Sequence, residues 1–408
     1  MKKQLFVFLA CLICGTNFSQ REDFKIYVDS LTSAYFSGRG YVNDGHLKTA
    51  AFLSNEFKRL KLSPVSNSYF QEFSINVNTF PSVCLLKVGE VSLMPGEDFV
   101  IDPSSGSSKG AFSVLPFVLG DSLYKSINKN IVFLLDVTEV IDLDSMGLYK
   151  QLKYSLANYG PVIWCSNEKL NWSISDHSYN YPIINLNQKI NLKPKEVLFM
   201  DIKNHFVSNL NTQNVIGKVS GRKNKILAIT AHYDHLGMMG NIMYPGANDN
   251  ASGISLLLNL AKYYTDKKNK YTMLFMCFGA EEIGLLGSKY FTQYPNIKLR
   301  KIKFLVNLDL VGTGDDGIAI VNAIEQKKYV KRITKMNSKN HDFKRVKIRG
   351  QAPNSDHYWF AKNDVPSIFI YTLGGVAHYH NPLDKSETLP LTKTDKLYDL
   401  IINFFNSF

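Results

Sequence analysis

The chain has 408 residues, of which 45% are hydrophobic and 20% are charged, and its formal net charge is +12. This is the composition of an ordinary globular protein with room for roughly two or three domains. The basic residues are scattered in short groups such as DKKNK and KLRKIK, and they form no stripe interleaved with aromatic residues. This pattern is typical of solvated basic faces, so we expect no nucleic-acid partner.

The first twenty residues, MKKQLFVFLACLICGTNFSQ, have a basic start, a short apolar stretch and a small, polar end. This is the pattern of a secretory signal, and its apolar stretch is too short for a membrane span. We therefore predict a signal peptide over residues 1–20 and export to the periplasm or the extracellular space. The residues before Cys11 and Cys14 fit a lipid-anchor signal poorly, so we expect neither a lipid anchor nor stable membrane insertion.

Three cysteines follow the predicted signal: Cys84, Cys165 and Cys277. An odd and sparse set predicts no disulfide framework and no paired-cysteine zinc site. Cys277 lies inside an apolar run and is expected to be a small buried hydrophobe. Pairing of Cys84 with Cys165 is left open by the sequence.

Residues 22–62 are predicted to be helical, because the apolar residues of DGHLKTAAFLSNEFKRLKL recur at spacings of three and four. The stretch SYFQEFSINVN then alternates as a strand does. Between residues 81 and 200, short apolar runs are separated by Gly, Ser and Asn turns, with one helix near LYKQLKYSLANY. This pattern predicts a smaller β-rich unit.

In the last half of the chain, apolar strands alternate with helices. KILAITAHYD, YTMLFMCFGAEE, KFLVNLDLVG and PSIFIYT are predicted strands, and SGISLLLNLAKYYTDKK is a predicted helix. Near-continuous apolar strands between helices indicate a mixed, mostly parallel sheet that is covered on both faces. The expected fold class is α/β, a sheet flanked by helices with an inserted smaller β-rich domain.

Residue types that bind metals follow four of these strands and precede one helix. They are His232 and Asp234, Glu281 and Glu282, Asp309, the group His378, His380 and Asp384, and Asp249 before the helix. Each alone has an ordinary interpretation, such as a turn residue, a helix cap or a solvated acidic pair. Together they lie where open α/β sheets bind ligands, beyond the carboxyl ends of the strands. Imidazole and carboxylate side by side indicate a cation site.

These stretches resemble the co-catalytic zinc aminopeptidases, metallopeptidase family twenty-eight, which includes secreted bacterial leucyl aminopeptidases and aminopeptidase Y. The resemblance is carried, in family order, by NVIGKVSG, TAHYDHLG, GANDNASG, GAEEIGLLGS, NLDLVG, SDH and YHNPLD. It implies a zinc-peptidase sandwich made from residues 21–80 and 201–408. Residues 81–200 resemble, more weakly, the protease-associated insertion of many members.

The resemblance also implies a set of metal ligands and two zinc ions per chain. Asp249 would bridge both ions. His232 and Asp309 would complete one site, and Glu282 and His380 would complete the other.

Two further residues would be catalytic. Glu281 would take a proton from the metal-bound water and pass it to the leaving amine. Asp234 would orient the imidazole of His232. Asp356 and His357 resemble residues of the family's pocket wall, and His235 and His378 are not expected to be ligands.

The implied function is that of a secreted zinc-dependent exopeptidase, an aminopeptidase that hydrolyses N-terminal residues from peptides. One alternative is a glutaminyl cyclase-like acyltransferase with a single zinc, which would be expected to lack the pair formed by His232 and Asp234. The other is a non-catalytic binding ectodomain on the same fold, which should lack one or more ligands. The oligomeric state and the preferred N-terminal residue are left open.

Overall fold

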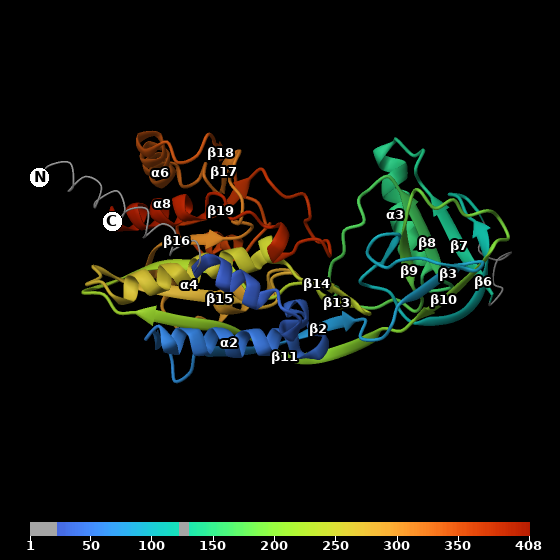
Figure 1. Ribbon diagram of the computed structural model, residues 1–408, viewed down its shortest axis with the longest axis horizontal. Helices are drawn as coiled ribbons and strands as arrows, with labels where there is room; N and C mark the ends of the chain where they lie inside the picture. The colour runs from blue at the N-terminus through green and yellow to red at the C-terminus, as the bar shows by residue number, and fades with distance from the viewer. Residues whose placement is uncertain (1–22, 122–129) are drawn as a thin grey trace, which may run out of the picture.

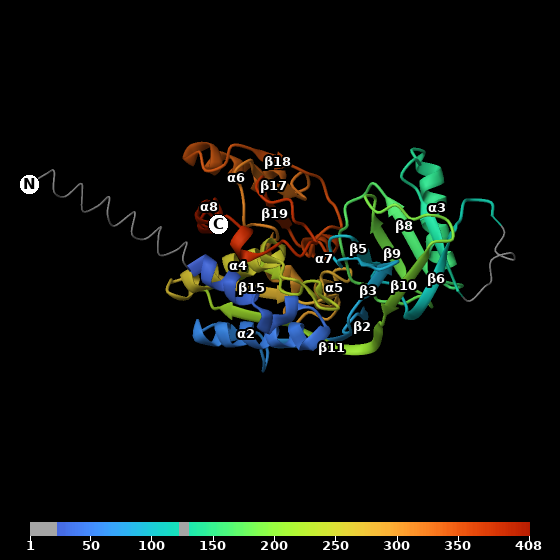
Figure 2. The ribbon, with the colours of Figure 1, turned by 45° about the vertical axis from the view of Figure 1, so that its right-hand side comes forward.

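The computed structural model describes residues 23–121 and 130–408, so the predicted signal peptide at 1–20 lies outside the described residues. The described chain forms a nine-stranded sheet, an eight-stranded sheet and a two-stranded hairpin. The two large sheets occupy opposite ends of an elongated molecule (Figures 1 and 2). None of the helices in these two ranges is long and apolar enough to cross a bilayer.

The nine-stranded sheet is mixed: its central pairs are parallel, antiparallel pairs flank them, and the edge pair β17–β18 is again parallel. Its order is β1-β11-β15-β12-β16-β19-β17-β18, with β2 paired to β11. The central pairs β15–β12, β12–β16 and β16–β19 are parallel, whereas β11–β15 and β17–β19 are antiparallel. The strands are β1 Ser63–Pro64, β2 Phe70–Thr79, β11 His205–Val219, β12 Lys223–His232, β15 Tyr271–Phe278, β16 Ile302–Leu308, β17 Gly317–Val321, β18 Val346–Ile348 and β19 Ser367–Leu373.

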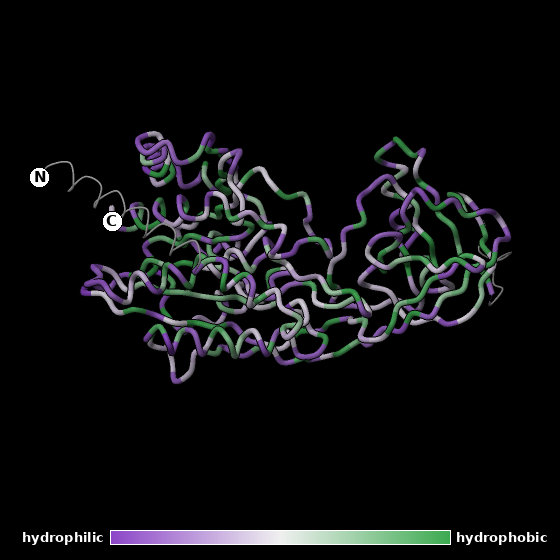
Figure 3. The backbone as a smooth tube through the Cα atoms, in the orientation of Figure 1, coloured by the Kyte–Doolittle hydropathy of each residue, from purple (hydrophilic) through white to green (hydrophobic). Residues whose placement is uncertain are grey.

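Helices cover both faces of this sheet, as the continuous apolar strands predict. In β15, Phe275 and Cys277 pack into the large core, whereas their neighbours Met276 and Phe278 pack into the opposite one. The large core includes apolar residues of residues 23–31, α2, α4, α6 and α8, and the opposite core includes residues of α5 and α7. The helices are α2 Gly45–Arg59, α4 Ser252–Thr265, α5 Leu286–Gln293, α6 Lys327–Asn340, α7 His357–Lys362 and α8 Thr394–Asn406. Figure 3 shows α6 as mostly hydrophilic, which fits its few buried residues.

We call the segment that forms the eight-stranded sheet the insertion, and its described residues include the helix α3 Leu143–Leu156. Its order is β4-β3-β10-β6-β7-β8-β9-β5. The strands are β3 Leu85–Val88, β4 Val91–Ser92, β5 Phe99–Ile101, β6 Ser108–Pro116, β7 Ile131–Asp136, β8 Val162–Ser166, β9 Ile183–Asn187 and β10 Val197–Ile202. The chain enters it from β2 and returns through β11, where Thr79 is paired with His205. The insertion therefore extends from one antiparallel ribbon of the first sheet.

The insertion and the first sheet share a core. The hairpin of β13 Gly237–Met239 and β14 Ile242–Tyr244 follows β12. Its residues Met239 and Tyr244, and Leu236 just before it, pack among the buried side chains of the eight-stranded sheet. Cys84 and Cys165 are buried within this core as free thiols.

Candidate metal centre

The predicted site residues meet at one edge of the nine-stranded sheet. His232 is the last residue of β12, and it pairs in register with Phe278, the last residue of the parallel strand β15. Glu281 and Glu282 follow β15 after a Gly-Ala turn, and Asp309 directly follows β16. Asp249 lies in the π-helical segment η4 Ala247–Ala251 that precedes α4, and His380 lies in the loop after β19.

Asp249 is at the centre of the cluster, and its two oxygens face different histidines. Its Oδ1 lies 3.3 Å from Nε2 of His232, and its Oδ2 lies 3.4 Å from Nε2 of His380. The same nitrogen of His232 is 3.3 Å from Asp309 Oδ1. The same nitrogen of His380 is 3.1 Å from Glu282 Oε2. The five predicted ligands thus form two halves that share one carboxylate.

The cluster fits divalent cations. The side chains of Asp249, Glu282 and Asp309 are only 5%, 5% and 8% exposed. Withdrawing several carboxylates from water is costly unless a cation compensates them. Among the described residues, the ligand atoms of two groups of three lie within 4.8 Å of one another: His232, Glu281 and Asp309, and His232, Asp249 and Glu282. Carboxylate with imidazole is the donor set that zinc accepts.

Asp234 lies beside His232, as the resemblance implied, and its carbonyl and carboxylate groups make different contacts. The atom nearest to Nδ1 of His232 is the Asp234 carbonyl oxygen, at 3.0 Å, whereas the Asp234 carboxylate is 3.9 Å away. That carboxylate instead accepts the backbone N–H groups of Glu281 and Glu282, at 3.1 and 3.3 Å. The buried turn after β15 leaves these two N–H groups in need of an acceptor. Asp234 therefore joins the two ligand-bearing turns, and its carbonyl orients the histidine.

Glu281 and Glu282 have opposite electrostatic environments. Burial raises the pKa of Glu281 well above its usual value; His232 opposes this rise, and Asp309 and Asp356 add to it. Burial and Asp249 also act to raise the pKa of Glu282, but the nearby histidines outweigh them and lower it to about 2. Adjacent carboxylates whose pKa values are driven apart are suited to different roles.

His235 contacts the cluster through Glu282. Its Nδ1 lies 2.6 Å from Glu282 Oε1, and its side chain has no exposed surface. His235 was not predicted to be a metal ligand, and the sequence did not predict its contact with Glu282. Its place directly after Asp234 in HYDH is the one available signal.

Arg39 holds the ligand-bearing loops through hydrogen bonds to their backbone, a role that the sequence did not predict. Its buried guanidinium donates to backbone carbonyl oxygens, at 2.6–3.2 Å, of Leu31, Tyr233, Pro245, Gly246 and Asp249. Burial lowers the pKa of Arg39 to about 10, against the opposing effect of the nearby acidic residues. In the sequence FSGRGY, the glycines on either side of Arg39 indicate that the backbone is closely packed there. A Cβ on Gly38 or Gly40 would lie within 2.6 Å of the backbone of residues 237–244.

Asp384 fixes the segment that carries Asp249. Its carboxylate accepts the backbone N–H groups of Asn248, at 2.9 and 3.1 Å, and of Asp249, at 3.1 Å. Because Asp384 belongs to the same loop as His380, the two ligand-bearing segments hold each other in place.

A cavity of about 240 Å³ adjoins the cluster. Besides ligand residues and Glu281, it is lined by Leu310, Arg349, Asn354, Phe369, Tyr371 and Tyr379. Arg349 donates to the Tyr371 hydroxyl at 2.9 Å. Asp356 and His357 do not line this cavity, contrary to the expected wall position; both are fully buried, and burial raises the pKa of Asp356 to about 7.

The fold and this cluster place the protein in a class: α/β proteins with a buried centre of imidazole and carboxylate groups. The fold matches the crystal structure of BSAP, a zinc aminopeptidase from Bacillus subtilis, with a TM-score of 0.69 over 95% of each chain and 20% identity. Residues 214–405 match the model of Peptidase family M28.

Two curated relatives each match about half of the chain. Aminopeptidase YwaD of Bacillus subtilis (strain 168) is 31% identical over 206 residues, which are 48% of this chain and 44% of the relative. Glutaminyl-peptide cyclotransferase of Drosophila melanogaster is 24% identical over 230 residues, which are 48% of this chain and 64% of the relative. The matched segment thus spans less than two thirds of either relative.

Proposed function

We propose that the protein is a zinc-dependent aminopeptidase that removes N-terminal residues from peptides. The observation that carries this proposal is the shared carboxylate of Asp249, which has His232 at one oxygen and His380 at the other. The family of residues 214–405 and the matching zinc aminopeptidase fold support the same reaction class.

The proposed centre holds two zinc ions. His232 and Asp309 would bind one, Glu282 and His380 would bind the other, and Asp249 would bridge them. Zinc bound at such a site supplies Lewis-acid polarisation of a peptide carbonyl and lowers the pKa of water to about 7.

In this mechanism Glu281 is the general base. It lies within the ligand cluster without a place in either proposed ligand set, and it lines the adjoining cavity, where a general base must lie to reach both water and substrate. Glu281 takes a proton from the attacking water and returns it to the leaving amine. The cavity beside it receives the substrate's N-terminal residue.

The likeness to the Drosophila cyclotransferase favours a second candidate, a single-zinc glutaminyl cyclase. The two candidates differ in products and metal content. A cyclase releases ammonia from an N-terminal glutamine and leaves the peptide bond intact, whereas the aminopeptidase releases a free amino acid.

We also propose that residues 81–200 are the inserted domain and that residues 1–20 direct export. The first proposal is supported by the separate eight-stranded sheet. The second rests on the basic and apolar pattern of the leader. Mature protein that retains Met1 in the cytoplasm would contradict export.

The test of function is a panel of aminoacyl chromogenic substrates, each paired with its N-acetylated form. The purified chain should hydrolyse only free-amine substrates. Phenanthroline should abolish the activity, and added zinc should restore it. Elemental analysis should find two zinc ions per chain. Full activity in a preparation verified as metal-free would contradict the proposal, and ammonia release from N-terminal glutamine would favour the cyclase.

A further inference from the structure

The insertion contacts His380, one of the proposed ligands. Nδ1 of His380 lies 2.8 Å from the carbonyl oxygen of Trp172. The backbone N–H of Trp172 returns a hydrogen bond to the His380 carbonyl oxygen at 3.2 Å. The two residues are 208 positions apart, and Trp172 lies in the insertion between β8 and β9.

This contact determines which nitrogen of His380 is free. A carbonyl oxygen only accepts hydrogen bonds, so Nδ1 must carry a proton and donate it. In the neutral imidazole, Nε2 is then the unprotonated nitrogen, and it is the atom that faces Asp249 and Glu282. The Trp172 carbonyl thus sets both the tautomer and the ring orientation that a metal needs.

Trp172 is itself held by the insertion. Its indole Nε1 donates to the Ile101 carbonyl oxygen of β5 at 2.9 Å. The residue is 4% exposed, and its ring lies 4.8 Å from the ring of Tyr244, centroid to centroid. The position of its carbonyl therefore depends on the shared core of the two sheets.

The other histidine needs no such support. Nδ1 of His232 contacts the carbonyl oxygen of Asp234, two residues away in the same turn. His232 is therefore oriented by its own turn, and His380 by a segment of the insertion.

We propose that Trp172 is a positioning residue for His380, through which the insertion sets the affinity of one of the two metal sites. The inference rests on the proposed metal centre. Disturbing Trp172 should weaken the ion held by Glu282 and His380 and leave the ion held by His232 and Asp309 nearly unchanged.

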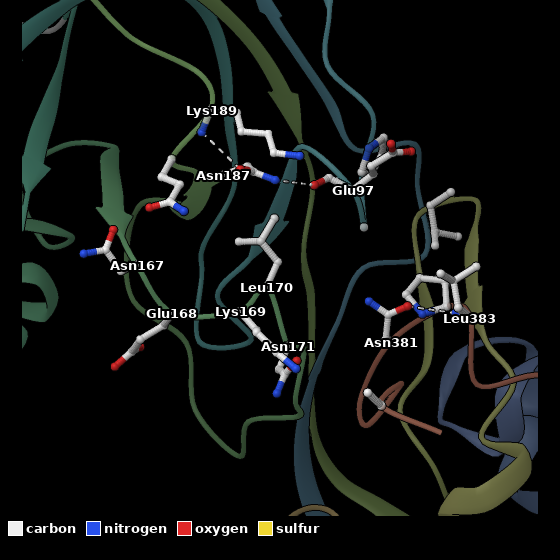
Figure 4. Close-up of a pocket in the computed structure, with 16 residues that line it drawn as sticks. Glu97, Asn167, Glu168, Lys169, Leu170, Asn171, Asn187, Lys189, Asn381 and Leu383 are labelled. Carbon is white, nitrogen blue, oxygen red and sulfur yellow. Dashed lines mark hydrogen bonds between the residues drawn. The ribbon is translucent and has the colours of Figure 1, made fainter. Parts of the chain in front are cut away.

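The surroundings provide matched controls. Asn171 and Asn381, the sequence neighbours of the contact pair, line a cavity of about 710 Å³. Figure 4 shows Lys169 and Asn171 on one side of it and Asn381 and Leu383 on the other. Asn171→Ala changes the same loop on its exposed side. Trp164 is a second tryptophan of the insertion, 3% exposed, in a different core.

The test measures zinc affinity of the full chain by competition with a chromogenic chelator, for Trp172→Ala, Trp164→Ala and Asn171→Ala. Trp172→Ala should weaken one of two ions by about 10–100-fold, the cost of losing such a supporting contact. Both controls should keep both affinities within about twofold. Equal behaviour of the two tryptophan variants, or equal weakening of both ions in Trp172→Ala, would overturn the inference.

A second readout is the ¹⁵N spectrum of the zinc-loaded protein. His380 should show a slowly exchanging Nδ1–H signal, assigned by its loss in His380→Gln, and Trp172→Ala should lose its protection. If Trp172→Ala does not fold, Trp172→Phe keeps a ring and removes the donor to Ile101; an unchanged signal and unchanged affinities would then overturn the inference. A wild-type chain that binds no zinc would instead refute the proposed function.

Discussion

At the scale of single residues, Glu281 and Glu282 are adjacent in the chain, but their carboxylates contact different groups and are expected to have different roles. Only Glu282 is within reach of two histidine rings, His235 and His380. Glu281 belongs to the group with His232 and Asp309. A consecutive pair after a strand points in different directions, so one carboxylate can hold metal while the other faces substrate.

The two glutamates should therefore respond differently to the same substitution. Glu281→Gln keeps size and polarity and removes proton acceptance, so turnover should fall by roughly 10²–10⁴-fold with zinc content retained. Glu282→Gln removes a charged ligand, so one zinc should bind more weakly and excess zinc should partly restore activity. Kinetics and zinc stoichiometry on both variants decide this. Metal loss in Glu281→Gln with retention in Glu282→Gln would mean that the roles are exchanged.

His357 should contribute to acid sensitivity. Burial lowers its pKa from 6.5 to about 4. The folded state therefore favours the neutral ring of His357. The free energy of unfolding has its full value above pH 6.5, and this contribution is lost as the pH falls through 4. The difference corresponds to roughly 3 kcal/mol.

Replacing the imidazole of His357 should make the free energy of unfolding less dependent on pH. His357→Phe should remove this contribution, so its free energy of unfolding should fall less than that of wild type between pH 6.5 and 4. Urea unfolding at a series of pH values measures it, with the exposed His205→Phe as control. Parallel profiles for wild type and His357→Phe would contradict the assignment.

The sequence indicated the ligand-type side chains that meet at this cluster, apart from His235, and it gave no sign of Arg39 or Trp172. The ligand types stand at strand ends, where the parallel β12, β15 and β16 bring them together. Arg39 donates to backbone carbonyl oxygens, and Trp172 accepts through its own carbonyl oxygen. Every residue has a carbonyl group, so the pattern of residue types does not predict such contacts. The same holds for Asp234, whose carbonyl oxygen lies closer to Nδ1 of His232 than its carboxylate does.

At the scale of elements, the long buried strands and the helix α4 agree with their apolar patterns. The short strands β17 and β18 were not predicted, because three to five residues at a sheet edge carry little periodicity. The segment η4, which carries Asp249, has no propensity signal either. Its shape depends on contacts with Arg39 and Asp384 from distant parts of the chain.

Asp384→Ala should disturb η4 without touching a ligand. It leaves the partly buried N–H group of Asn248 and the buried N–H group of Asp249 without their acceptor, and a buried unsatisfied group costs roughly 1–3 kcal/mol. The free energy of unfolding should fall by roughly that amount, and zinc affinity should fall with it. Denaturant unfolding and chelator competition measure the two effects. Glu387→Ala, at an exposed site in the same region, is the control; if both variants behave alike, Asp384 does not hold η4.

At the scale of the whole molecule, the insertion is attached through one ribbon and docked through a shared core. The boundaries 81–200 follow from the turn-rich composition, and the sheet runs from β3 to β10. The docking could not be predicted, because Leu236, Met239 and Tyr244 look like ordinary core residues of the first sheet. Their packing among insertion side chains is visible only in three dimensions.

Excision of the insertion should test this arrangement. Thr79 and His205 are paired, so a two-residue Asn-Gly turn can join them. The shortened chain should retain the secondary structure of the nine-stranded sheet by circular dichroism but aggregate, because Leu236, Met239 and Tyr244 become exposed. Polar substitutions at these three positions should restore a monodisperse peak in size-exclusion chromatography. A shortened chain that is soluble without them would show that the shared core is dispensable.

The scattering of the centre along the chain has a consequence for biosynthesis. Two of its supports and its five proposed ligands are made in the order Arg39, Trp172, His232, Asp249, Glu282, Asp309 and His380. A nascent chain that has reached Asp309 still lacks one ligand, and that ligand takes its working orientation from a tryptophan synthesised 208 residues earlier. The proposed hydrolase therefore stays inert through most of its own translation, and becomes able to cut peptides only after both sheets have folded and docked.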